Sequence, residues 1–232
     1  MQELFASGDG GIKLRVAAHG DRALPAVILL HGLGRDGDDW AEVGSALADE
    51  HWVLAPDQRG HGRSDRPRLY SFELMAKDIA AMMDDLEVST ANIVGHSMGG
   101  SVAFEFVEEW PERVTRLVIE DTPPPRVGWS FPMPPDEEPP GVPFDWPLAH
   151  ALTAQLNNAD PKWWNELPNI KVPTLIVGGG TTSHVDPHEL AEVAELIPNC
   201  ELVTFEGAGH AVHATRLTGF LDVLRPFLGS PD

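Results

Sequence analysis

The chain has 232 residues, of which 42% are hydrophobic, and its 36 acidic and 16 basic side chains give a formal charge of −20. This charge would repel nucleic acids and anionic membranes, so neither is expected as a partner. The single cysteine excludes an internal disulfide, no apolar run approaches the ~20 residues of a membrane span, and the N-terminus lacks the pattern of a secretory signal, so a cytoplasmic protein is expected.

The predicted elements alternate between strands and helices. A glycine-rich turn at 8–11 predicts a hairpin between 3–7 and 12–18. Further strands are expected at 25–30, 52–57, 91–94, 116–121, 173–178 and 201–205. Helices are expected at about 38–48, 72–86, 101–110, 187–197 and 212–228. The alternation predicts a mostly parallel central sheet flanked by helices in a single domain of residues 1–232, with reactive groups at the carboxyl ends of the strands.

Residues 123–168 interrupt this alternation. They hold more than half of the 21 prolines, which is incompatible with a long helical domain and leaves room for one short helix at 150–156. A loop-rich cap inserted above an active site is expected. Two roles remain open for its large apolar side chains, lining a hydrophobic pocket or anchoring the insertion to the body: Phe131, Met133, Phe144, Trp146, Trp163 and Trp164.

The segment Gly95-His96-Ser97-Met98-Gly99 fits the pattern G-x-S-x-G between a predicted strand and a predicted helix. This context is typical of a nucleophile elbow, in which a serine sits on a strained turn above the sheet. Glycines on either side allow the strand and the helix to approach closely. The alternative is an ordinary turn in which Ser97 caps the helix.

Other motifs accompany the elbow: His31-Gly-Leu-Gly34, Asp57-Gln-Arg-Gly-His-Gly-Arg-Ser64, Pro111-Glu-Arg-Val114 and Gly207-Ala-Gly-His210. Together with the elbow they resemble the α/β-hydrolase superfamily over nearly the whole chain, apart from the insertion. The resemblance implies the α/β-hydrolase fold and the chain order nucleophile, acid, histidine.

Catalytic roles follow for several residues. Ser97 would be the nucleophile and His210 its base, because a histidine pKa near neutrality suits proton transfer. His213 falls inside a predicted helix and is the weaker candidate. The backbone N–H groups of Leu33 and Met98 would form the oxyanion hole, and their side chains would either line the pocket or belong to the core.

The acid departs from the pattern of the superfamily. Most relatives carry it after the strand that here ends at Gly178, and the matching position holds His184, with Asp186 two residues further on. A second known location, after the preceding strand, holds Asp121 beside Glu120. Neighbouring residues on a strand point to opposite faces, so at most one of these two should serve. Asp121 is preferred, followed by Asp186 and then Glu120.

Two competing motifs are set aside. His184-x-Asp186-x-His188 offers three potential metal ligands, but Pro187 interrupts the segment where a helix should begin. The glycine-rich loop 57–64 lacks the G-K-[ST] ending of a phosphate-binding loop and is interpreted as structural, with Arg59 or Arg63 tying it to an acidic neighbour. Neither a metal ion nor a cofactor is therefore expected.

The resulting functional hypothesis is serine hydrolysis of a small carboxylic ester through an acyl-enzyme, with a small ester-like molecule as the binding partner. Lactonase, thioesterase and carbon–carbon bond hydrolase activities remain alternatives within the same class. A ligand-binding relative without turnover is an alternative of another class, because the usual acid position holds a histidine. The sequence does not indicate an oligomeric state.

Overall fold

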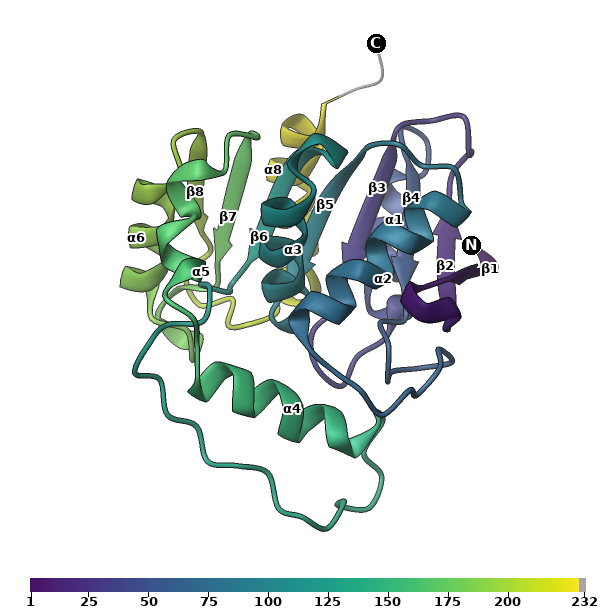
Figure 1. The fold of residues 1–232 in the computed structure, drawn as a ribbon. Helices are drawn as coiled ribbons and strands as arrows, with labels where there is room; N and C mark the ends of the chain where they lie inside the picture. Colours follow the sequence, from purple (N-terminus) through teal and green to yellow (C-terminus); the bar gives the residue numbers. More distant parts are fainter. Residues whose placement is uncertain (230–232) are drawn as a thin grey trace.

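The computed structural model describes residues 1–229 and places eight strands in one sheet (Figure 1). Their order across the sheet is β1-β2-β4-β3-β5-β6-β7-β8. Strand β2 is antiparallel to both of its neighbours, and all pairs from β4–β3 onward are parallel. The bounds are β1 Gln2–Ser7, β2 Lys13–His19, β3 Ala26–Leu30, β4 Trp52–Pro56, β5 Ala91–His96, β6 Val114–Glu120, β7 Thr174–Gly178 and β8 Cys200–Thr204. The predicted mostly parallel sheet and the N-terminal hairpin are confirmed.

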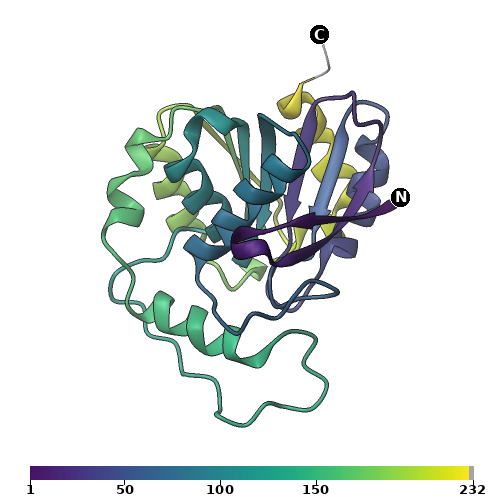
Figure 2. The same cartoon turned by 45° about the vertical axis from the view of Figure 1, so that its right-hand side comes forward.

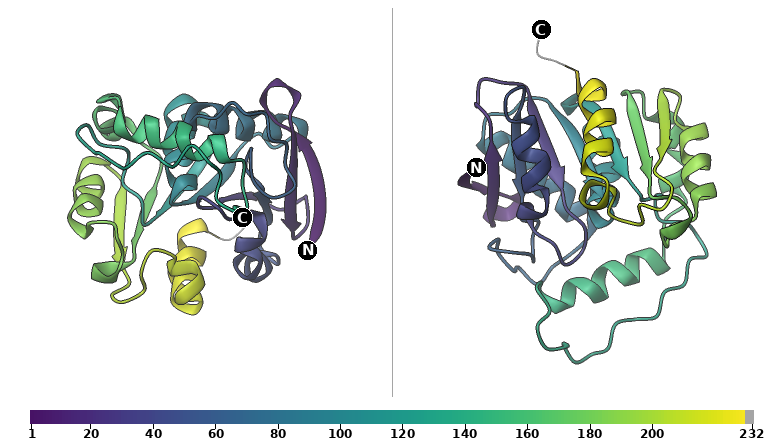
Figure 3. Two further views of the ribbon diagram at one scale, coloured as in Figure 1. Left: turned by 90° about the horizontal axis from the view of Figure 1, so that it is seen from below. Right: turned by 180° about the vertical axis from the view of Figure 1, so that it is seen from behind.

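Helices cover both faces of the sheet. Their bounds are α1 Ala41–Leu47, α2 Phe72–Asp85, α3 Met98–Glu109, α4 Trp146–Asn157, α5 Lys162–Asn165, α6 Pro187–Leu196, α7 Val212–Thr215 and α8 Leu217–Leu228. Helices α2, α3 and α6 lie on one face, and α1 and α8 lie on the other (Figure 3). Successive strand residues alternate between the two cores: Ile28 belongs to the first, and Val27 and Leu29 to the second. Burial on both faces explains why the central strands are continuous apolar runs.

Two predicted helices differ from the structure. The closing helix expected at 212–228 is divided into α7 and α8 at Arg216, whose backbone is not helical (φ −136°, ψ 41°). The helix expected at 150–156 begins earlier, at Trp146, and includes Pro147. Proline is tolerated there because the N–H groups of the first helical turn have no partner within the helix.

The connection from β6 to β7 leaves the body at the carboxyl ends of the strands. Helix α4 crosses this edge of the sheet, and an irregular segment loops outside it (Figures 1 and 2). The Tyr70 hydroxyl donates to the Asp145 carboxylate (2.5 Å), and the Asp145 N–H donates to the Gly60 carbonyl (2.8 Å). These bonds fix the start of α4 to the loop that follows β4.

The apolar side chains of the insertion divide between the two expected roles. Phe131 lines a cavity, whereas Phe144 is buried against His61 and Trp163 is buried against Phe72. Trp164 stacks with the guanidinium of Arg126. Phe144 and Trp163 therefore anchor the insertion to the body, whereas the stacking of Trp164 on Arg126 joins two residues of the insertion. None of the helices within residues 1–229 is long and apolar enough to cross a membrane.

Candidate active site

Ser97 occupies the tight turn between β5 and α3, where its backbone adopts a positive φ (φ 54°, ψ −122°). A non-glycine residue in this region is strained and persists only where its surroundings enforce it. A Cβ on Gly95 would lie 2.3 Å from the Gly99 carbonyl oxygen, and a Cβ on Gly99 would lie 2.2 Å from that of Leu30. Both glycines are therefore required by close backbone approach, as the G-x-S-x-G pattern predicts.

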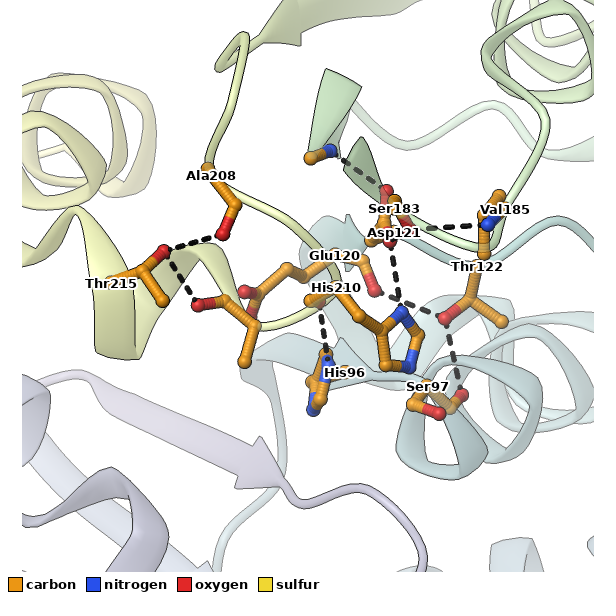
Figure 4. Close-up of polar contacts among 12 residues, drawn as sticks. His96, Ser97, Glu120, Asp121, Thr122, Ser183, Val185, Ala208, His210 and Thr215 are labelled. Atoms are coloured by element: carbon orange, nitrogen blue, oxygen red, sulfur yellow. Dashed lines mark hydrogen bonds and ion pairs between the residues drawn. The ribbon is translucent and has the colours of Figure 1, made fainter. Parts of the chain in front are cut away.

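Asp121 lies directly after β6 and holds the side chain of His210. The Nδ1 atom of His210 lies 2.9 Å from Asp121 Oδ2, and the carboxylate is only 1% exposed (Figure 4). The Gly179 N–H donates to Asp121 Oδ1 (2.7 Å), and the Ser183 hydroxyl also donates to Oδ2. A bond from Nδ1–H to the carboxylate leaves the imidazole Nε2 free to accept a proton.

The imidazole of His210 lies between Asp121 and Ser97 (Figure 4). Ser97 and His210 line the same cavity, although no hydrogen bond joins their side chains within residues 1–229. Bonds between a nucleophile and its base are often long in unliganded sites and shorten when substrate binds. The carbonyl of His210 also accepts a hydrogen bond from His96 Nε2 (2.9 Å), which ties the loop to the end of β5.

The other two candidate acids serve different partners. Asp186 caps α6 by accepting from the His188 N–H (2.9 Å). Glu120 is fully buried and accepts from both the backbone N–H (2.9 Å) and Nδ1 (2.8 Å) of His213. Among the three carboxylates, only Asp121 therefore contacts His210.

The pair formed by Glu120 and His213 was not predicted from the sequence. His213 is 2% exposed, stacks on Trp40, and places Nε2 3.4 Å from the Asp39 carboxylate. Burial alone would lower the pKa of His213, but the charge of Glu120 and the contact with Asp39 raise it to about 9. Burial alone would raise the pKa of Glu120, and the neighbouring histidines reverse this shift. Two adjacent acids and two histidines three residues apart were the available sequence signal.

His184, at the position where the resemblance places the acid, lies beside His210 instead. Its ring centroid is 4.1 Å from that of His210. Burial and the neighbouring His210 both lower the pKa of His184. The ring centroid of His96 also lies close to that of His210, at 4.7 Å, and burial likewise lowers the pKa of His96. His210 therefore contacts two imidazoles whose neutral forms are favoured, while His213, which contacts His96, favours its charged form.

The glycine-rich loop after β4 supports the site without entering it. Asp57 accepts hydrogen bonds from the N–H groups of Gly37 and Arg63, both at 2.8 Å. Arg59 pairs with the buried carboxylate of Asp78, and Arg63 pairs with Glu3, so both arginines tie the loop to an acidic neighbour. Gln58 N–H donates to Nε2 of His31 (3.0 Å), and burial lowers the pKa of that histidine to about 4.

Leu33 and Met98 both lie on the wall of the cavity that contains Ser97. Within residues 1–229, neither backbone N–H donates a hydrogen bond to another residue. A Cβ on Gly32 would lie 3.2 Å from Ser97 Cβ, so the loop that carries Leu33 passes close to the serine. Two N–H groups from different segments are thus available beside Ser97.

The cavity has a volume of about 500 Å³. Its floor contains Ser97, Met98 and His210, and one face of α4 contributes Ala149, Leu152 and Leu156 to its wall. A cavity of this size is typical of small-molecule sites. The described residues contain no group of three side chains that could hold a metal ion.

Residues 25–166 match the family described as the alpha/beta hydrolase fold, so the chain belongs to this family. It is 28% identical to a Haemophilus influenzae protein named "Putative esterase/lipase", over 88% of this chain and 83% of that protein. It is 27% identical to an sn-1-specific diacylglycerol lipase of Mus musculus, over 90% of this chain and 82% of that protein. The structure of the enol-lactonase from Burkholderia xenovorans LB400 superimposes with a TM-score of 0.82 at 24% identity, covering 97% of this chain and 99% of that one, which is a likeness of fold.

The buried pair of Glu120 and His213 predicts a pH-dependent stability. The pKa of His213 rises from 6.5 to about 9 on folding, so its protonation contributes fully below pH 6.5 and is lost as the pH rises through about 9. We expect this contribution to the free energy of unfolding, about 3 kcal/mol, to disappear over that range. Chemical denaturation at several pH values measures it.

The control is the double variant Glu120→Gln/His213→Gln, which removes both charges and leaves neither one unpaired. Its free energy of unfolding should depend much less on pH between 6.5 and 9. The same pH dependence in both proteins would contradict a charged His213.

Proposed function

We propose that the protein hydrolyses small carboxylic esters with Ser97 as nucleophile, His210 as general base and Asp121 as the orienting acid. The observation that carries this proposal is the hydrogen bond between His210 Nδ1 and Asp121 beside the strained elbow of Ser97. It fixes the tautomer in which Nε2 accepts the serine proton. The relatives described as an esterase or lipase and as a diacylglycerol lipase support ester bonds as the target.

The reaction proceeds in two halves. Ser97 Oγ attacks the ester carbonyl carbon while His210 Nε2 takes its proton, and the same proton is then given to the leaving alcohol. Water, activated by His210, next attacks the acyl-enzyme and releases the carboxylic acid. The Asp121 carboxylate stabilises the imidazolium in both halves without itself taking the proton.

The backbone N–H groups of Leu33 and Met98 would bind the oxyanion of each tetrahedral intermediate. Their freedom from other hydrogen bonds and their place on the cavity wall support this role. Each such donor is typically worth ~10²–10³ in rate. The position of Met98 at the start of α3 adds the favourable end of the helix dipole.

The insertion at 123–168 would act as a cap that excludes water from the cavity and binds the acyl group. Leu152 and Leu156 from α4 and Phe131 from the preceding loop lie on the cavity wall opposite the elbow. A lactone is a cyclic ester, so the same groups also suit lactone hydrolysis. The Asp121–His210 contact favours an enzyme over a ligand-binding relative without turnover, because such a relative has no need of an oriented base.

Turnover of para-nitrophenyl acetate and labelling by a fluorophosphonate test the proposal directly. We expect both in the wild type and neither in Ser97→Ala, because only the serine hydroxyl forms the acyl-enzyme. Intact mass spectrometry and release of para-nitrophenol are the measurements. Turnover retained in Ser97→Ala would exclude the mechanism, and an unlabelled, inactive wild type would exclude the enzyme.

The choice of acid predicts a large difference between two matched variants. Asp121→Asn should lower kcat by ~10⁴, the cost of losing the acid of a known triad. Asp186→Asn should remain close to the wild type, because asparagine also caps helices well. Steady-state kinetics with the same ester decide the matter, and near-normal turnover in Asp121→Asn would overturn the assignment.

Ser183 should influence the pH dependence of turnover through its hydrogen bond to Asp121. Its hydroxyl accepts from the Val185 N–H (3.1 Å), which directs its own proton to the carboxylate. Ser183→Ala leaves more negative charge on Asp121 to stabilise protonated His210, so the acid limb of kcat/KM should move to higher pH. Ser183→Thr, which keeps the hydroxyl, should restore the wild-type profile. Identical profiles in the wild type and Ser183→Ala would show that the hydroxyl has no such effect.

A further inference from the structure

We infer that the cavity selects esters with an uncharged acyl group, and that Glu189 on α6 is a residue that determines this specificity. The inference rests on the proposed ester hydrolysis, because it names the class of substrate for the same site. It is carried by the distribution of charge on the wall of the cavity.

The wall opposite the elbow is built to receive an apolar group. Ala149, Leu152 and Leu156 recur at helical spacing along one face of α4, and Phe131 faces them from the outer loop. Asn157 fixes Phe131 by accepting from its N–H (2.6 Å) and donating to its carbonyl (2.9 Å). An apolar acyl group that enters this space exchanges its contacts with water for apolar contacts with the protein.

The charged side chains on the wall are acidic. Asp186 and Glu189 both line the cavity, and no lysine or arginine of the described residues does. Within residues 1–229, no lysine or arginine pairs with Asp186. An anionic acyl group would therefore lose its hydration and meet charges of its own sign.

Arg126 is a basic group that pairs with Glu189, and it has other partners as well. Its guanidinium lies 3.7 Å from Glu189 and 2.6 Å from Glu192, and it stacks on the ring of Trp164. One positive charge thus faces two carboxylates, and Arg126 itself does not line the cavity. The sum of the charges of Arg126, Glu189 and Glu192 is therefore negative. The net charge of the whole chain, −20, has the same sign.

The test compares para-nitrophenyl esters that share one reacting carbonyl. The hemiester of glutaric acid carries a distal carboxylate, and its methyl ester carries none. We expect kcat/KM to be at least ~100-fold lower for the hemiester than for its methyl ester. Placing two like charges in contact raises the free energy of the bound hemiester enough to lower its reaction rate by that factor. Turnover of para-nitrophenyl acetate in parallel reports the proposed function independently of this comparison.

Two variants on the same helix separate Glu189 from the general surface charge. Glu189→Gln and Glu192→Gln each remove one carboxylate that pairs with Arg126, but only Glu189 lines the cavity. The ratio of kcat/KM for hemiester to methyl ester should rise about tenfold in Glu189→Gln and stay near the wild-type value in Glu192→Gln. Measurements repeated at about 0.5 M salt screen the distant surface charges.

Each outcome decides one claim. Equal turnover of the hemiester and the methyl ester, or equal ratios in the two variants, would overturn the inference while leaving ester hydrolysis intact. If no ester is cleaved, the proposed function fails, and calorimetric binding of both compounds to the protein still tests the exclusion of anions. Binding of the methyl ester alone supports the inference, and equal binding refutes it.

Discussion

The rest of the site depends on two adjacent carboxylates at the end of β6, each of which holds a different histidine. Asp121 binds the side chain of His210, and Glu120 binds the backbone and side chain of His213. The end of β6 and the residue directly after it therefore hold the segment that follows β8 at two points. The position of His210 over Ser97 therefore depends on β6 as much as on its own glycine-rich loop. The sequence predicts that at most one of the two acids serves as the catalytic acid, and only Asp121 contacts His210, while Glu120 contacts His213.

The favoured charge state of the histidines differs between the buried pair and the residues nearer the cavity. The pKa of His213 is raised to about 9 because two carboxylates outweigh its burial, whereas burial lowers the pKa of His96, which touches both His210 and His213. Replacing both partners of a buried ion pair by apolar residues often changes stability little, but the loss of one partner alone leaves an uncompensated charge. The fully buried Glu120 thus binds His213, and Asp121 alone of the two binds His210. A neutral His96 lies between the buried pair and His210 at the cavity.

Patterns within short stretches of the sequence were sufficient to predict the strands, the hairpin and the turn at Ser97. The sheet, the hairpin and the elbow at Ser97 follow from apolar runs and from glycines that are required by close approach. Which acid meets His210 depends on where the ends of β6 and β7 and a loop near the C-terminus come together, and no local pattern encodes that. The start of α4 at Trp146 was missed because Pro147 was read as a helix breaker, although it stands in the first turn. The break at Arg216 has no proline or glycine to signal it, since Arg216 lies between Thr215 and Leu217.

The loop after β7 holds the carboxylate of Asp121, which follows another strand. By resemblance this loop should carry the acid, but here it carries His184 and supplies hydrogen-bond donors instead. Gly179 N–H and the Ser183 hydroxyl both bind Asp121, so the loop positions a carboxylate that it does not provide. The same loop continues into Asp186 and Glu189 on the cavity wall. One segment therefore links the proposed orientation of the base to the proposed exclusion of anions, and a change in its path would alter both together.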